Sequence, residues 1–424
     1  MNTESIHAFL EKHGMLAERI DPLKEAGPMS AEMEAGLHGG DSVFPMIPTY
    51  LRADGELPHG KNAIVIDAGG TNFRCGLISF TEEGPVLSRV FKAKMPGVER
   101  PVTWEAFISF VADAVLPLAD EADDIGFCFS YSAVITPEID GRVICIDKEV
   151  VVTGSENRLV GASLLAELER RGVTGKHVVI LNDTAAVLLG GAVTLDRSRC
   201  GGLIGQVSGT GTNTCCILPL SRIVKLGDDR DTRIIVNLES GSYDKLPHGD
   251  FDLSLDRSSH NPGEKLLEKL TSGVYLGLLT HEILRAAVEE GLLSAAAYHR
   301  IESLGRFSAS AADAWANGEQ LELCETEADA ALLQTVSRNL FERSARAMCT
   351  NLLAILLLTG EGKDPEKPVV VCAEGSLVQK GRWYRPALER FLREGCRALG
   401  RSVVLKVGEE TTLPGSAFAA VLNR

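Results

Sequence analysis

The chain has 424 residues, 45% of them hydrophobic and 24% charged, and a formal net charge of −15. A globular protein of this length is expected to divide into about two or three domains with a cleft between them. The negative charge argues against nucleic acid or an anionic membrane as a partner. A site for an anionic nucleotide must therefore be local, built from backbone N–H groups, a few cations and a metal ion.

The ten cysteines are scattered without C-x-x-C spacing, so they indicate neither a disulfide framework nor a zinc site. The first residues lack a basic region followed by an apolar run, and the apolar stretch at 352–358 is too short to span a bilayer. We therefore expect a cytoplasmic protein.

In chain order, residues 1–40 predict short amphipathic helices broken by Gly14, Pro22 and Pro28. A strand at 63–67, a glycine turn and a strand at 75–80 follow. This part therefore predicts a strand–turn–strand unit after a helical lead-in.

The middle of the chain alternates helices with strands. Thr103 can cap a helix that ends near Pro117. The expected strands lie at 125–129, 143–146 and 177–181, and the expected helices at 159–171 and 185–193. This alternation favours an α/β chain with mixed sheets.

The rest of the chain becomes mostly helical from about residue 262 to 358. Asn261-Pro262-Gly263 predicts a helix start with proline at the first helical position. A last strand–turn at 369–376 precedes a helix–strand pair and a tail of small residues at 415–422.

Two glycine turns are candidates for binding phosphate. The first, Gly69-Gly-Thr-Asn72, leads into a strand and matches neither the P-loop nor the dinucleotide-binding pattern. The second is Gly209-Thr-Gly211. Gly70-Thr-Asn72 followed by 75–78 parallels Gly211-Thr-Asn213 followed by 216–218; a duplicated phosphate module predicts this repeat, and chance could also produce it. N–H groups and hydroxyls in such turns suit phosphate oxygens, while a plain β-hairpin is the alternative for either turn alone.

Three carboxylates are candidates for chemistry. Asp183 follows a strand, where side chains face the ligand cleft of α/β sheets, and it is placed to accept a hydroxyl proton. Taken alone, the Asn-Asp-Thr triplet is better explained as an ordinary helix N-cap. Glu239 and Glu268 are ambiguous too, because a glutamate flanked by Lys265 and Lys269 is often a solvated face residue.

In combination the motifs are more specific. Asp67-Ala-Gly-Gly-Thr-Asn-Phe-Arg74 resembles the first phosphate motif of the hexokinase family, Asp-x-Gly-Gly-Thr-Asn-Phe-Arg. Other segments resemble later family motifs in the family's order: Phe129-Ser130, Lys148, Asn182-Asp183-Thr184, Gly209-Thr210-Gly211-x-Asn213, Asn237-x-Glu239, Asn261-Pro-Gly263 with Glu268, Ser272-Gly273-x-Tyr275-Leu-Gly277 and Glu374-Gly-Ser376. The resemblance runs from about residue 42 to the C-terminus.

The resemblance implies an α/β, two-lobed actin-like ATPase (ribonuclease H-like) fold with mixed sheets flanked by helices. Residues 62–182 with 413–424 would form the small lobe, and residues 1–61 with 183–412 the large lobe. It further implies an ATP-dependent hexokinase of glycolysis that uses Mg²⁺ and closes its lobes on a hexose. Monomer and homodimer both stay open.

Residue roles follow position by position from the resemblance. Asp183 would be the general base for the sugar 6-hydroxyl and Arg74 a second catalytic residue. The sugar hydroxyls would be bound by Ser130, Asp147, Lys148, Asn182, Asp183, Glu239 and Glu268. ATP would be bound by Asp67, Gly69, Gly70, Thr71, Asn72, Arg74, Gly209, Thr210, Gly211, Asn213, Gly375 and Ser376, with Asp67 also holding Mg²⁺ through water.

Departures from the family pattern bear on the substrate. Phe129-Ser-Tyr-Ser132 replaces Phe-Ser-Phe-Pro, Ile146-Asp-Lys-Glu149 replaces Trp-Thr-Lys-Gly, and Glu374 replaces an aspartate. Asp147 thus adds a charge beside the sugar. Glucose is the first substrate expected and fructose or mannose the next; a kinase for another sugar or amino sugar, and a non-catalytic sugar-binding regulatory protein, are the alternatives.

Overall fold

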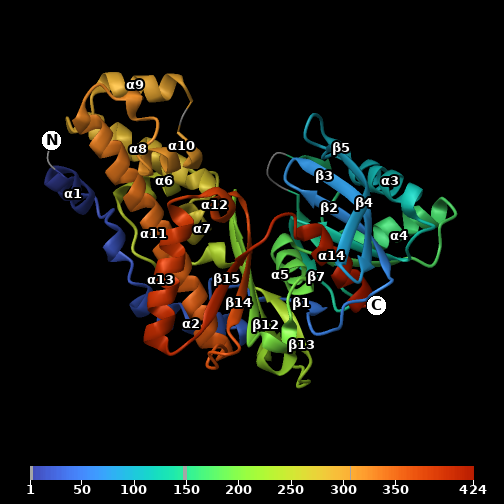
Figure 1. Ribbon diagram of the computed structural model, residues 1–424. Coiled ribbons are helices and arrows are strands. Elements are labelled where there is room, and N and C mark those ends of the chain that lie inside the picture. Colours follow the sequence, from blue (N-terminus) through green and yellow to red (C-terminus); the bar gives the residue numbers. More distant parts are fainter. Residues whose placement is uncertain (1–2, 147–149, 306) are drawn as a thin grey trace.

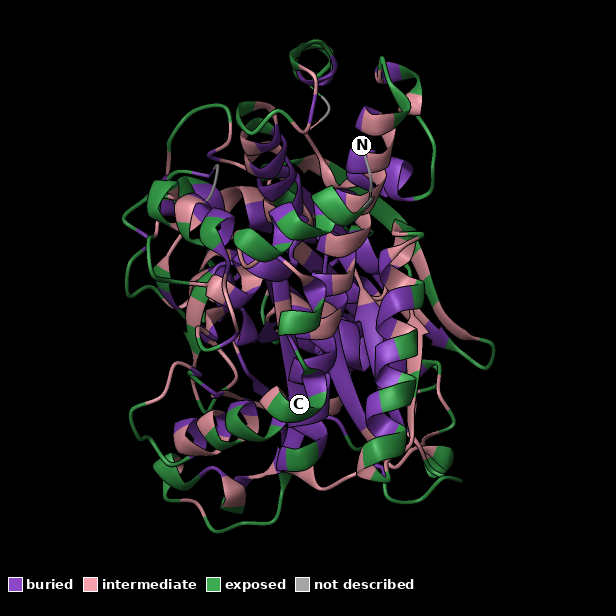
Figure 2. Ribbon diagram, turned by 90° about the vertical axis from the view of Figure 1, so that its left-hand side faces the viewer, coloured by how far each residue is buried: buried purple, intermediate pink, exposed green. Residues whose placement is uncertain are grey.

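The computed structural model describes residues 3–146, 150–305 and 307–424. Within these residues a six-stranded and a five-stranded sheet form two halves of the molecule, with helices over their faces (Figure 1). Buried residues occupy the strands and the inward faces of the helices (Figure 2). The expected α/β architecture with mixed sheets is confirmed.

The five-stranded sheet has the order β10-β6-β2-β3-β4. Its strands are β2 (Asn62–Gly69), β3 (Asn72–Thr81), β4 (Gly84–Lys94), β6 (Asp124–Phe129) and β10 (His177–Leu181). β2, β6 and β10 run parallel, while β3 and β4 are antiparallel additions. The carboxyl ends of the three parallel strands therefore meet at one edge of the sheet.

Side chains of β2 alternate between two cores, as a strand buried on both faces requires. Ile64 and Ile66 pack into the cluster of α3 (Trp104–Val115) and α4 (Val160–Arg170). Ala63 and Val65 pack into the cluster of α5 (Asp183–Val193) and α14 (Thr412–Leu422). By the same alternation, the next residue on the α5 face is Asp67.

The six-stranded sheet has the order β1-β13-β12-β11-β14-β15. Its strands are β1 (Ile47–Arg52), β11 (Gly202–Ser208), β12 (Thr212–Pro219), β13 (Arg233–Asn237), β14 (Val369–Glu374) and β15 (Val403–Val407). One face packs into the core of α2 (Pro22–Leu37), α11 (Glu327–Thr359) and α13 (Tyr384–Leu399). The other face packs on α5, which thus lies between the two sheets (Figure 1).

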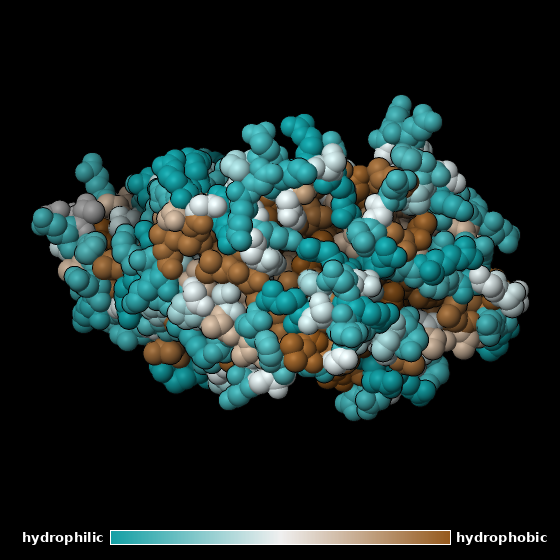
Figure 3. Space-filling model, turned by 90° about the horizontal axis from the view of Figure 1, so that it is seen from below, coloured by the Kyte–Doolittle hydropathy of each residue, from teal (hydrophilic) through white to brown (hydrophobic). Residues whose placement is uncertain are grey.

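The described residues form further helices and two small sheets. The helices are α1 (Thr3–Lys12), α6 (Asp250–Ser258), α7 (Leu266–Thr271), α8 (Gly273–Glu289), α9 (Ala295–Ser303), α10 (Ala309–Ala316) and α12 (Ser376–Lys380). Two small sheets pair β5 (Val102–Thr103) with β9 (Val152–Thr153), and β7 (Ser132–Ile135) with β8 (Gly141–Cys145). In the described residues no helix has both the length and the apolar character to cross a bilayer. Hydrophilic side chains interrupt the hydrophobic areas on the face seen from below (Figure 3).

Two expectations about proline are wrong. Pro28 lies inside α2 and does not break it. An internal proline costs about 3 kcal/mol, but Met29, Met33 and Leu37 of the same helix are fully buried, and each such burial contributes roughly 1.5–3 kcal/mol. Packing therefore outweighs the local penalty.

The second correction concerns the start of the helical region. Pro262 lies in a turn, and α7 begins only at Leu266, after Lys265 in a left-handed conformation. The shift to helix begins earlier, at Asp250 of α6. Proline at the first helical position and proline in a turn look alike in sequence, because both need the same φ angle.

Candidate active site

The first glycine turn joins β2 to β3. Gly69 pairs with Asn72, so Gly70 and Thr71 form the turn, and Gly70 has a left-handed φ of 56° that glycine adopts without strain. Across the hairpin, Arg74 donates from Nε and Nη2 to Asp67 Oδ2 at 3.0 and 2.7 Å. Burial lowers the pKa of Arg74, but attraction to Asp67 more than offsets it and the pKa is raised.

The three parallel strand ends place further candidates beside this hairpin. Asp67 is paired with Cys128, and Cys128 with Leu181, two residues before Asp183. Burial raises the pKa of the Cys128 thiol, and the charges of Asp67 and Asp183 raise it further. Both carboxylates therefore lie close to one buried thiol, and the Ser130 hydroxyl is 3.7 Å from its sulfur.

Asp183 begins α5, the helix between the two sheets. The capping hydrogen bond comes from its neighbour: Asn182 Oδ1 accepts from the N–H of Ala185 at 3.1 Å. Asp183 Oδ1 instead accepts from the Thr184 hydroxyl at 3.1 Å. The N-cap interpretation thus applies to Asn182, and the half-buried carboxylate of Asp183 lies at the helix end that stabilises negative charge.

The second glycine turn joins β11 to β12. Ser208 pairs with Thr212 across the loop, and the N–H of Gly209 donates to Gly211 O at 3.0 Å. A Cβ on Gly209 would lie 3.3 Å from both Gly375 Cα and Ser376 N. The structure therefore brings together the turn at 209–211 and the Gly375-Ser376 segment that follows β14.

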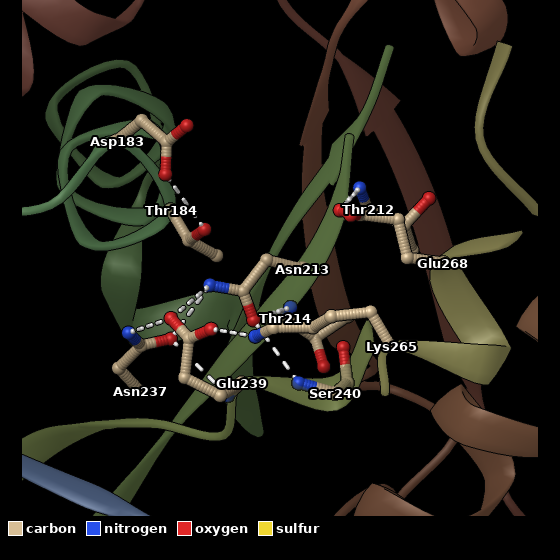
Figure 4. A network of polar contacts seen from close by, with 10 residues as sticks. All are labelled: Asp183, Thr184, Thr212, Asn213, Thr214, Asn237, Glu239, Ser240, Lys265 and Glu268. Carbon is tan, nitrogen blue, oxygen red and sulfur yellow. Dashed lines mark hydrogen bonds and ion pairs between the residues drawn. The ribbon is translucent and has the colours of Figure 1, made fainter. Parts of the chain in front are cut away.

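Polar side chains from four segments meet below this turn (Figure 4). Asn237 Nδ2 donates to Glu239 Oε1 at 2.9 Å, and Asn213 Nδ2 donates to the same oxygen at 3.3 Å and to Asn237 Oδ1 at 2.8 Å. Lys265 Nζ donates to Glu239 Oε2 at 2.7 Å. Asn213, expected among the nucleotide ligands, thus contacts Glu239, which is expected to bind the sugar.

Glu268 joins this network to the second turn. Its Oε2 accepts from the N–H of Thr212 at 2.9 Å. The lysines on either side of it are not solvated face residues: Lys265 binds Glu239, and Lys269, 4% exposed, binds Asp256 Oδ1 at 2.6 Å. The sequence did not predict either lysine contact. The alternative interpretation of Glu268, a solvated residue on a helix face, does not fit these contacts.

The two glycine turns are linked through the segment that leads into α14. Arg74 Nη1 lies 3.5 Å from Glu410 Oε1. The next residue, Thr411, donates from its N–H to Glu374 Oε2 at 3.0 Å, and its hydroxyl donates to the same oxygen. Glu374 pairs with Val207, one residue before the end of β11. Asp147 and Lys148, also expected at the site, lie outside the described residues.

A small cavity lies between the two halves. Its volume is about 20 Å³, and its lining includes Asn182 and Phe129 from one sheet region and Thr49 and Asn237 from the other. This is room for about one water molecule. Residues from both halves therefore line one small cavity, and Asn182 of the candidate site is among them.

Comparison with known proteins agrees with this architecture. Two family models, both described as hexokinase, match residues 6–193 and 203–422. The hexokinase-1 of Nicotiana tabacum is 27% identical over 456 aligned residues, which cover 98% of this chain and 89% of that protein.

Solved structures show the same fold. Hexokinase from Schistosoma mansoni complexed with glucose matches with a TM-score of 0.76 at 21% identity, covering 98% of this chain and 99% of that chain. A ROK family glucokinase from Streptomyces griseus in complex with glucose and AMPPNP matches with a TM-score of 0.51 at 16% identity, covering 85% and 99%.

The fold is therefore the two-lobed, actin-like ATPase fold of sugar kinases, as the sequence predicted. The two family matches together span most of the chain, and the first of them includes α5. The chain belongs to the hexokinase family, and it is a sugar kinase that phosphorylates an alcohol group.

Proposed function

We propose that the protein transfers the γ-phosphoryl group of ATP to the 6-hydroxyl of a hexose, with Asp183 as general base. Glucose is the first sugar to test, and fructose and mannose are next. The placement of Asp183 carries the proposal, because it stands at the sheet edge that also bears Asp67 and at the start of the helix between the two sheets. The Schistosoma structure, which contains glucose, and the Streptomyces structure, which contains glucose and AMPPNP, support the choice of substrates.

On the nucleotide side, the two glycine turns supply backbone N–H groups and hydroxyls for phosphate oxygens. The ligands we assign are Asp67, Gly69, Gly70, Thr71, Asn72, Arg74, Gly209, Thr210, Gly211, Asn213, Gly375 and Ser376. Among the described residues no three His, Cys, Asp or Glu side chains are grouped to hold a metal ion. That suits Mg²⁺, which keeps several waters and binds through one or two carboxylates plus substrate phosphates; here Asp67 would hold it through water and it would neutralise phosphate charge.

On the sugar side, Ser130, Asn182, Glu239 and Glu268 offer the acceptors and donors that hydroxyl groups need. Asp147 and Lys148 keep the same proposed role from the sequence. The half-buried position of Glu239 and Glu268 suits charge-assisted hydrogen bonds, which are shorter and stronger than neutral ones.

The chemistry needs alignment more than covalent help. Phosphoryl transfer depends on positioning, charge neutralisation and a residue that orients the nucleophile. Asp183 would accept the 6-hydroxyl proton as that oxygen forms its bond to the γ-phosphorus and ADP leaves. Water must be excluded from this step, since it would compete for the phosphoryl group.

Water exclusion calls for two lobes that close. We propose that residues 62–182 with 413–424 move as the small lobe, and residues 1–61 with 183–412 as the large lobe. The packing of α14 on β2 and β6 supports assigning the C-terminal segment to the small lobe.

The first prediction tests the general base. Asp183→Asn should lower kcat at least about 100-fold, because a positioned proton acceptor contributes at least that much. The measurement is coupled ADP release with glucose, fructose, mannose and glucosamine in turn. Asp250→Asn is the matched control: Asp250 is also the first residue of a helix, α6, and it lies with His13 outside the site. Hexose-dependent turnover that is unchanged in Asp183→Asn would rule out the assignment.

A further inference from the structure

Lys265 occupies an unusual backbone position beside the candidate sugar site. It precedes α7 with a left-handed φ of 55°, and Glu239, its ion-pair partner, has a left-handed φ of 54°. Residues other than glycine rarely adopt this conformation, because it is strained for a residue with a Cβ. Because both partners of this ion pair have strained backbones, the surrounding structure must stabilise the backbone conformation of each.

The contacts of the Glu239 carboxylate are divided between its two oxygens. Oε1 accepts from Asn237 and Asn213 at 2.9 and 3.3 Å, whereas Oε2 accepts from Lys265 Nζ at 2.7 Å (Figure 4). The two ion-pair side chains are 35% and 30% exposed. The pair is therefore partly shielded from water yet open to a ligand.

The stem of Lys265 is also held. A Cβ on Gly241 would lie 3.7 Å from Lys265 Cδ, 3.1 Å from Glu268 Cβ and 3.1 Å from Thr212 O. The lysine thus crosses Gly241 next to Glu268, the second carboxylate of the proposed sugar site. Contact with Gly241 therefore helps to orient the Lys265 side chain toward Glu239.

Lys269, one helical turn later, gives a useful contrast. Its Nζ binds Asp256 Oδ1 and Asn261 O at 2.6 and 2.7 Å, and it is 4% exposed. These contacts fasten the 261–263 turn to α6. Lys269 is therefore a structural residue, whereas Lys265 contacts a residue of the proposed site.

We propose that Lys265 is a positioning residue for hexose binding, which fixes Glu239 Oε2 and balances its charge so that the carboxylate meets the sugar in one orientation. The inference rests on the proposed hexokinase function. Without Lys265, the two amides still hold Oε1, but Oε2 loses the hydrogen bond from the Lys265 ammonium and the sugar must bind a less ordered carboxylate. Phosphoryl transfer, which depends on Asp183 and the phosphate groups, is not weakened.

The second prediction follows. Lys265→Met should raise the KM for glucose about tenfold, the effect of losing a charged hydrogen bond at the low end of its range because the pair is partly exposed. The kcat and the KM for ATP should change by less than about twofold, since loss of uniform binding raises KM alone. Lys265→Arg should restore most of the glucose affinity and Lys265→Gln part of it, because the first keeps the charge and the second only a donor.

Lys12→Met is the matched control, since it removes an ion pair of similar length, 2.8 Å to Glu290, that joins α1 to the end of α8. Its glucose KM should equal that of the wild type. An unchanged glucose KM in Lys265→Met overturns the inference, as does a KM rise that Lys265→Arg does not reverse. Failure of the proposed function itself is distinct, because the wild type would then release no ADP in response to any hexose.

Discussion

At the residue scale, neighbouring side chains divide structural and chemical tasks between them. Asn182 caps α5 while Asp183 lies at the sheet edge, and Lys269 fastens a turn while Lys265 contacts Glu239. In each pair, the nearby residue makes the structural contact: Asn182 accepts a hydrogen bond from the backbone of α5, and Lys269 pairs with the Asp256 carboxylate. The proposed functional residue can then be substituted with limited loss of fold, which is what makes the kinetic tests interpretable.

A buried ion pair gives the third prediction. Arg343 of α11 is 1% exposed and donates from Nη1 and Nη2 to the two oxygens of Asp252 in α6, at 3.1 and 2.5 Å. Arg343→Met should lower the free energy of unfolding by about 3–5 kcal/mol, because it leaves the Asp252 charge buried without its partner. Urea unfolding measures this.

The double variant Arg343→Met with Asp252→Leu is the control for that prediction. It removes both charges, so it should recover a large part of the lost stability. If the double variant lost the sum of the two single effects, the two side chains would not be coupled and the prediction would fail.

At the scale of elements, α5 and α14 touch backbone to backbone. A Cβ on Gly415 of α14 would lie 1.9 Å from Ala186 O, and one on Gly190 of α5 would lie 2.0 Å from Thr411 O. Neither contact leaves space for a methyl group. Because α5 also begins at Asp183, the spacing of these two helices helps to set where the proposed base lies.

The fourth prediction concerns this spacing. Gly415→Ala should lower the free energy of unfolding by about 1–3 kcal/mol or more, since overpacking forces the helices apart. It should also lower kcat. Gly27→Ala, in α2 with no atom within 4 Å of the added Cβ, should instead be neutral or gain up to about 1 kcal/mol from better helix propensity. Thermal unfolding and ADP release measure both variants; equal stability for the two would contradict the packing argument.

Local patterns predicted most elements and one hairpin, but not how strands distant in the sequence pair. The strand at 177–181 follows from a continuous apolar run, and the β2–β3 hairpin follows from two apolar segments joined by a glycine turn; the structure confirms both. Pro28 misled the prediction because helix packing decided its effect. The Lys265–Glu239 contact spans 26 residues between two loops, and no local pattern specifies such a contact. The motifs therefore named candidate residues, while tertiary structure was needed to show which of them meet.

At the scale of the whole molecule, the charge constrains how an anionic substrate can bind. The chain carries −15, so the long-range field opposes ATP, although salt screens it beyond about 8 Å at physiological ionic strength. Two cations beside the first glycine turn already have partners: Arg74 is paired with Asp67, and Lys94, which lies opposite Asn72, is paired with Glu99. Affinity for phosphate must therefore come mainly from oriented N–H groups and a metal ion, which fits two glycine turns better than a basic patch.

The fifth prediction concerns the dependence of stability on pH. Burial lowers the pKa of His248 below its usual 6.5. The imidazole is therefore protonated more readily in the unfolded chain than in the folded one. Stability is then lost as pH falls below about 6.5. For Asp252, burial raises the pKa, but the charge of Arg343 outweighs this effect and the net pKa lies below 3.8. The contribution of Asp252 to folding stability is therefore present above about pH 3.8 and is lost as the pH falls through the pKa of the folded state. Urea unfolding across this range should show two successive losses. His248→Gln should remove the first and keep the second, whereas a first loss of equal size in His248→Gln would show that another group causes it.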